Sequence, residues 1–225
     1  MFRVTALTHS LIGKKVVMAV TGIVLIGFVL GHMVGNLKVF QGAEHFNAYA
    51  EGLRTFGAPL FGRGQLLWIV RLVLLASVAL HIAAAWAVTR ASWAARPHAY
   101  RTLELVETSY AARTMRWGGV IILLFVVFHL LDLTFGPANP SFIPGNTYHN
   151  VVATFSRTPV AAAYIVAMGV LSLHLYHGIY SACQTLGVNH ARFNAWRRGF
   201  ALAFSLVVAG GFVAVPVAVL AGAVR

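Results

Sequence analysis

Five long apolar runs constrain this chain more than any other feature of its sequence. They cover residues 16–39, 66–88, 117–135, 160–182 and 200–224. A transmembrane α-helix needs about 20 consecutive apolar residues, whereas a membrane β-strand needs about ten with alternating polarity. These runs are too long for such strands and show no period of two. We therefore predict an all-α, integral membrane bundle of five transmembrane helices, with residues 1–225 forming a single domain.

The composition agrees with a membrane protein and excludes several kinds of site. Only 10% of the residues are charged, whereas soluble domains have about 25%. The net charge is +12, but the basic residues lie beside the apolar runs, which favours contact with membrane lipid and not with nucleic acid. The single cysteine, Cys183, excludes an intrachain disulfide, an iron–sulfur cluster and a covalently attached c-type haem.

The distribution of basic residues predicts how the chain is oriented. Positive charge favours the cytoplasmic side of a membrane, and eleven of the 17 Lys and Arg residues fall on the side that includes the N-terminus. We therefore predict a cytoplasmic N-terminus and an external C-terminus. The eleven are Arg3, Lys14, Lys15, Arg90, Arg96, Arg101, Arg113, Arg116, Arg192, Arg197 and Arg198; the other six are Lys38, Arg54, Arg63, Arg71, Arg157 and Arg225.

The two external loops differ in character. Residues 45–54 mix aromatic and charged side chains, which predicts an amphipathic helix lying at the membrane surface. Residues 136–157 contain Pro137, Pro140 and Pro144, which predicts an irregular loop.

Histidines inside the apolar runs are the main candidates for function. Five of the ten lie there: His32, His81, His129, His174 and His177. Ionisable groups at this depth are costly and usually functional. Neutral imidazole is a common haem-iron ligand, and helix bundles hold haems between facing side chains.

Distance along the helices sorts four of these histidines into two levels. With a rise of about 1.5 Å per residue, His32 lies about 25 Å from Lys15, and His129 about 20 Å from Arg116. His81 lies about 13 Å from Arg90, and His174 about 18 Å from the region of Gly187. The first two then belong to the external half of the membrane and the other two to the cytoplasmic half. This arrangement predicts two bis-histidine haems, stacked across the membrane between the first four helices.

Small residues near the histidines predict room for a macrocycle. Gly35 follows His32 and Gly178 follows His174 by about one turn, and Gly27 and Gly31 extend the row that ends at Gly35. The alternative for this row is close helix–helix packing. An alternative for the histidines themselves is a set of interhelical hydrogen bonds or a proton relay, and His177 competes with His174 as a ligand.

Several motifs resemble the cytochrome b membrane anchors of succinate dehydrogenases and fumarate reductases, of the type with one five-helix polypeptide and two haems. The motifs are SLIGKK (10–15), GHMVGNL (31–37), HFNAY (45–49), LHLYHGIYSA (173–182) and QTLGVNH (184–190). The resemblance covers nearly the whole chain. In that family each of the first four helices supplies one axial histidine, and a glycine four residues after the ligand selects His174 in the fourth.

The resemblance implies further expectations. His32 and His129 would bind the external haem b, and His81 and His174 the cytoplasmic haem b. A flavoprotein subunit would act on succinate or fumarate, and an iron–sulfur subunit would exchange electrons with the anchor; both would dock on the cytoplasmic face of a bacterial inner membrane. The anchor itself would not act on succinate, but would exchange electrons with a membrane quinone, menaquinone or ubiquinone.

The resemblance also implies an acidic residue near the external haem that takes part in quinone chemistry. Glu51 is the candidate, with His45 and Arg54 as neighbours, while Glu44 competes for the role and Asp132 is a further candidate for handling protons. Two other functions remain open. One is a cytochrome b subunit of a hydrogenase or formate dehydrogenase, and the other is a haem-free, proton-coupled transporter that uses the histidines as a relay.

Overall fold

The computed structural model describes residues 10–95 and 110–225, and every regular element in these two segments is a helix. Five of the helices are long and apolar enough to cross a membrane. A lipid environment favours this outcome, because a helix satisfies its own backbone hydrogen bonds where no water is present. The prediction of an all-α chain with five such helices is confirmed, and the protein is a multi-pass membrane protein.

The long helices follow the apolar runs closely. They are α2 (Leu11–Asn36), α4 (Gln65–Ala94), α5 (Tyr110–His129), α7 (Thr158–Thr185) and α8 (Asn194–Leu220). A 3₁₀ turn, η1 (Leu37–Gln41), continues α2, and a π-helical turn, η2 (Leu130–Thr134), continues α5. The shorter elements are α3 (Ala43–Thr55), α6 (Thr147–Phe155) and η3 (Ala191–Phe193).

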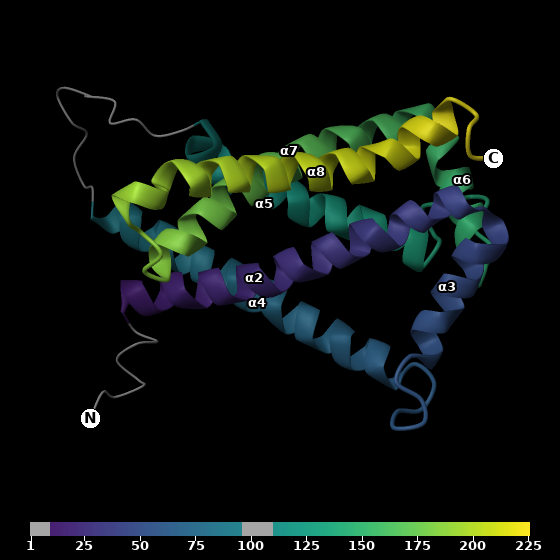
Figure 1. Cartoon of the computed structure of the whole chain (residues 1–225), viewed down its shortest axis with the longest axis horizontal. Coiled ribbons are helices and arrows are strands. Elements are labelled where there is room, and N and C mark those ends of the chain that lie inside the picture. Colours follow the sequence, from purple (N-terminus) through teal and green to yellow (C-terminus); the bar gives the residue numbers. More distant parts are fainter. Residues whose placement is uncertain (1–9, 96–109) are drawn as a thin grey trace.

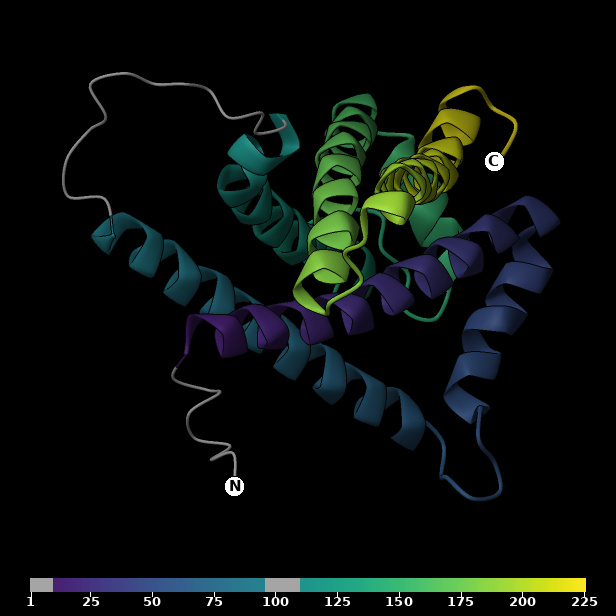
Figure 2. The same cartoon turned by 60° about the vertical axis from the view of Figure 1, so that its left-hand side comes forward.

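The long helices form two layers (Figures 1 and 2). The first layer contains α2 and α4, and the second contains α5, α7 and α8. Helix α2 also packs against α7 and α8 and so joins the layers. Among the long helices in the described part of the chain, α4 packs closely only against α2. The side of α4 that faces the second layer is therefore left with few helix contacts.

The short helices α3 and α6 lie at the same end of the bundle as the C-terminus (Figure 1). We call this the external end and the opposite one the cytoplasmic end, following the predicted orientation. Of the basic residues behind that prediction, Arg3, Arg96 and Arg101 lie outside the described residues, as does the side chain of Arg113.

The most continuous core also lies at the external end. There α3, α6, α7 and α8 bring together one cluster of buried side chains, which includes Phe46, Phe155 and Tyr164. Away from it, only 6% of the apolar stretch of α4 and of α5 is buried within the chain, against 33% for α8. Large apolar side chains on the outer faces, such as Leu75 and Val166, are exposed, which suits contact with lipid.

Helix α3 confirms the predicted helix over residues 45–54, whereas the prediction of an irregular loop over residues 136–157 holds for 136–146 and is wrong for the rest. Helix α6 occupies Thr147–Phe155. The side chain of Asn146 caps it by accepting a hydrogen bond from the backbone N–H of His149 at 3.1 Å, and Val151 and Phe155, four residues apart, are both buried. All three prolines precede the cap, so they lie in the irregular segment and do not interrupt the helix.

The last transmembrane helix begins and ends earlier than the apolar run from 200 to 224 predicts. Helix α8 starts at Asn194 and ends at Leu220. Its first turn is held by Arg197, which is 2% exposed and donates to the carbonyl oxygen of Val188 at 2.5 Å and to Asn189 at 3.1 Å. Arg197 lowers the hydropathy of this segment, so the apolar run begins only at residue 200. The buried side chain nevertheless stabilises the start of the helix at Asn194.

Candidate functional site

Four intramembrane histidines face one another as two pairs. The ring centres of His32 on α2 and His129 on α5 lie 5.8 Å apart, with the planes at 86°. The ring centres of His81 on α4 and His174 on α7 lie 6.3 Å apart, with the planes at 57°. These are the two pairs that the depth argument predicts, and each pair spans the two layers of the bundle.

The spacing and donor set of each pair fit a haem. Two imidazoles that bind one iron from opposite faces have ring centres about 6 Å apart, because each metal–nitrogen bond is about 2 Å long and each ligating nitrogen lies about 1 Å from its ring centre. The porphyrin supplies the other four bonds, so two protein ligands suffice. No cluster of three or more His, Cys, Asp or Glu side chains occurs among the described residues, so in this part of the chain the histidines form pairs, which suit a haem better than a bare metal ion.

Hydrogen bonds orient two of the four rings. Nδ1 of His81 lies 3.1 Å from the carbonyl oxygen of Met18 and 3.2 Å from Oγ1 of Thr21. Nδ1 of His129 lies 3.4 Å from the hydroxyl of Tyr164. Metal-binding histidines usually donate their second ring N–H to such oxygen atoms. In both rings this leaves Nε2 as the nitrogen available to a metal.

The His174 ring keeps a nitrogen free and borders a cavity. Its Nδ1 is buried and has no hydrogen-bond partner within residues 10–95 and 110–225. An apolar cavity of about 180 Å³ between α5 and α7 is lined by His174 and by Gly118, among others. A methyl group added at Gly119 would lie 3.9 Å from Cε1 of the same ring. The cavity therefore lies beside this candidate ligand, and a methyl group at Gly119 would only just touch its ring.

The glycines on α2 only partly match the prediction. Methyl groups added at Gly27 and Gly31 would meet nothing within 4 Å, so these two positions border open space. At Gly35 the expectation of room for a macrocycle is wrong: a methyl group there would lie 2.7 Å from the hydroxyl of Tyr49. Gly35 is the place where α3 packs against α2. Gly178, by contrast, has nothing within 4 Å.

His177 lies three residues from His174 on α7 and is half-buried. It forms no ring contact with His81 or any other described aromatic residue, whereas His174 does. The geometry therefore favours His174 over His177 as the residue that faces His81.

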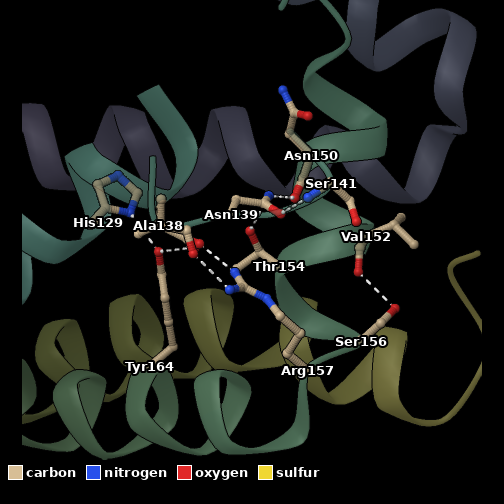
Figure 3. A network of polar contacts seen from close by, with 11 residues as sticks. His129, Ala138, Asn139, Ser141, Asn150, Val152, Thr154, Ser156, Arg157 and Tyr164 are labelled. Atoms are coloured by element: carbon tan, nitrogen blue, oxygen red, sulfur yellow. Dashed lines mark hydrogen bonds and ion pairs between the residues drawn. The ribbon is translucent and has the colours of Figure 1, made fainter. Parts of the chain in front are cut away.

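A buried polar network adjoins the external histidine pair (Figure 3). Asp132, in the π-helical turn after His129, is 0% exposed. It forms an ion pair with Arg157 and accepts a hydrogen bond from the hydroxyl of Tyr164 at 3.1 Å. Arg157 also donates to the carbonyl oxygen of Ala138 at 2.8 Å. The network thus links the end of α5, the following loop and the start of α7.

The sequence reasoning identified Asp132 as a candidate but missed its partners, Arg157 and Tyr164. An isolated acid in an apolar run needs a nearby cation, and that requirement is the one signal that points to a basic residue in the adjoining loop. Tyr164 gives no such signal, because a tyrosine in a membrane helix is unremarkable in composition. Its role depends on the direction in which α7 faces α5.

Glu51 lies on α3, at the external end, and is partly exposed. It forms ion pairs with Arg54 at 3.0 Å and with Arg63 at 2.5 Å. Glu44 and His45 lie near the start of the same helix and are exposed. Of these acids, Glu51 is the one whose carboxylate is held between two guanidinium groups.

Comparison with known proteins identifies the family. The family model described as the succinate dehydrogenase/fumarate reductase transmembrane subunit matches residues 94–214, which is more than half of the chain. The chain belongs to this family. No curated protein and no solved structure matches it. The match includes α5, α7 and most of α8, and so two of the four facing histidines of this membrane subunit, His129 and His174.

Proposed function

We propose that this chain is the dihaem cytochrome b anchor of a succinate:quinone oxidoreductase in a bacterial cytoplasmic membrane. The single observation that supports it most is the pair of facing histidine couples, with ring centres 5.8 and 6.3 Å apart, in a chain of this family. Neither a hydrogenase-type cytochrome nor a histidine relay accounts for both the family and two couples at the spacing of a shared iron.

In this proposal His32 and His129 bind the external haem, and His81 and His174 bind the cytoplasmic one. Bound haem supplies one-electron redox chemistry inside the membrane. The histidines position it, the apolar helices exclude water from it, and the hydrogen bonds at Nδ1 of His81 and His129 hold those two rings in a ligating tautomer. Succinate or fumarate would be converted elsewhere in the complex.

The cytoplasmic end is the proposed docking face for an iron–sulfur subunit and, through it, for a flavoprotein subunit. Four arginines are exposed at this end, from the ends of α4, α5 and α8 and the turn before α8: Arg90, Arg116, Arg192 and Arg198. A positive surface of this kind favours a partner with a complementary acidic face. It also favours anionic lipid headgroups where the partner does not cover it.

At the external end we propose that Glu51 belongs to the site of a membrane quinone, with menaquinone preferred over ubiquinone. Quinone chemistry exchanges protons as well as electrons, so it needs an acid–base group at the membrane surface. Glu51 supports this proposal because it lies on α3, the helix whose Tyr49 packs on α2 at Gly35, one turn from His32.

The test is the haem content of the purified complex and of single histidine variants. We expect two b-type haems per chain in reduced-minus-oxidised absorption spectra. His129→Ala should remove one component and His174→Ala the other, because each leaves an iron with one protein ligand. His177→Ala is the matched control for His174→Ala and should keep both components. If His129→Ala and His174→Ala both retain two haems, the ligand assignment is wrong.

A further inference from the structure

Tyr164 is placed to connect the external histidine couple to a buried charge. Its hydroxyl lies 3.4 Å from Nδ1 of His129 and 3.1 Å from Oδ2 of Asp132. The side chain is 5% exposed and Asp132 is 0% exposed. Figure 3 shows the Tyr164 side chain reaching from α7 toward the His129 ring.

The ion pair with Arg157 sets the direction of the hydrogen bonds. An ion-paired carboxylate only accepts hydrogen bonds, so the hydroxyl of Tyr164 donates its one proton to Asp132. Its oxygen then has lone pairs left to accept a hydrogen bond from Nδ1–H of His129. The chain of contacts therefore runs from the His129 ring through the hydroxyl to a carboxylate held by Arg157.

We propose that Tyr164 and Asp132 are positioning residues that fix the His129 ring with Nδ1 protonated and lower the reduction potential of the external haem. This inference rests on the proposed function. A hydrogen bond from the second ring nitrogen makes the imidazole a stronger electron donor. A stronger donor favours the oxidised iron, which has the higher charge. Burial next to an ionised carboxylate strengthens the effect, because the local dielectric is low.

The effect is confined to one of the two haems. Within the described residues, Nδ1 of His81 meets a neutral backbone carbonyl, and Nδ1 of His174 meets no partner. His32 has ring contacts with Phe28 and Phe212 but no side-chain hydrogen bond to any other described residue. As far as the structure describes the chain, His129 is the one ring of the four that is linked to an ionised carboxylate through a hydrogen bond.

The packing around Tyr164 makes a clean variant available. Its ring contacts Phe125 and Phe155 edge to face, with ring centres 4.9 and 5.0 Å apart. Tyr164→Phe keeps these contacts and removes only the hydroxyl. Tyr148→Phe is the matched control, because Tyr148 packs against Phe46 in the same external core and does not contact His129.

The experiment is redox titration of the whole purified complex, with the external haem identified as the spectral component that His129→Ala removes. We expect Tyr164→Phe to raise the midpoint potential of that component by an amount equal to a tenfold change in the redox equilibrium, about 59 mV for one electron. The other component should not move, and Tyr148→Phe should move neither. Asp132→Asn should shift the same component in the same direction.

The outcomes separate this inference from the proposed function. If the unaltered complex lacks two b-type haems, the proposed function fails. If it has two and Tyr164→Phe leaves both potentials unchanged, or shifts only the cytoplasmic component, the inference alone is overturned. Loss of the external haem alone in Tyr164→Phe supports it, since outer hydrogen-bond partners commonly change metal affinity 10- to 100-fold. Loss of both haems indicates a structural role and contradicts it.

Discussion

At the scale of single residues, acidic side chains are few in this protein, and two of them are held in ion pairs. The five acids of the chain include Asp132, which is ion-paired and buried, and Glu51, which is ion-paired and partly exposed. The difference in exposure separates their roles. A carboxylate sealed from water beside a ligating ring suits a structural and electronic task, whereas one at the surface is accessible to a diffusing quinone and to protons.

Replacing Glu51 tests the second of these roles. We expect Glu51→Gln to keep both haems, because the residue does not contact any of the four facing rings, and to lower quinone turnover about 100-fold through loss of an acid–base group. The measurement is steady-state quinone reduction with succinate, beside the haem spectrum of the same preparation. Glu44→Gln, about two helix turns earlier on α3 and exposed, is the comparison variant. A normal rate in Glu51→Gln with a reduced rate in Glu44→Gln would move the site to Glu44.

At the scale of elements, the sequence predicted those helices whose position follows from hydropathy and from amphipathic periodicity. The five spans and the surface helix α3 follow from apolar length and amphipathic spacing. Helix α6 and the π-helical turn were not predictable in the same way. Both are stabilised by contacts between distant segments, such as the hydrogen bond from Tyr148 N–H to Asn47 at 2.9 Å and the ion pair of Asp132 with Arg157. A single sequence does not show which residues of two loops will meet.

The packing of α6 on α7 gives a prediction at this scale. Phe155, at the end of α6, is buried and contacts the Tyr164 ring. We expect Phe155→Ala to destabilise the external end by about 3 kcal/mol, through lost contacts and the cavity left behind. The measurement is the thermal midpoint of the detergent-purified complex, followed by haem release. Phe135→Ala is the control, because Phe135 lies at the same end of the bundle and is 68% exposed. An equal loss of stability in both variants would show that α6 does not depend on the contact between Phe155 and Tyr164.

At the scale of the whole molecule, each candidate haem site lies between two long helices, α2 and α5 or α4 and α7, that do not pack closely against each other within the described residues. Each histidine couple has one ring in the layer of α2 and α4 and the other in the layer of α5, α7 and α8. Helix α4 packs closely only on α2 among the described long helices, and the His81–His174 couple joins it to the second layer. The depth argument predicted which rings pair, but not that the couples bridge two layers, because helix order in space is not encoded in hydropathy.

This arrangement predicts that bound haem holds α4 in place. A ligand that binds only the assembled bundle stabilises it by mass action, and the stabilisation should be largest in the element with the fewest other contacts. We expect the amides of α4 to exchange with deuterium faster in complex prepared from haem-depleted cells than in the haem-loaded complex. Exchange in α8 should change little, because α8 packs along α7 and a third of its apolar stretch is buried. Hydrogen-exchange mass spectrometry measures both helices in one sample. Equal protection of α4 in the two preparations would mean that contacts with α2 alone position it, and that the cytoplasmic histidine couple is already formed before its metal arrives.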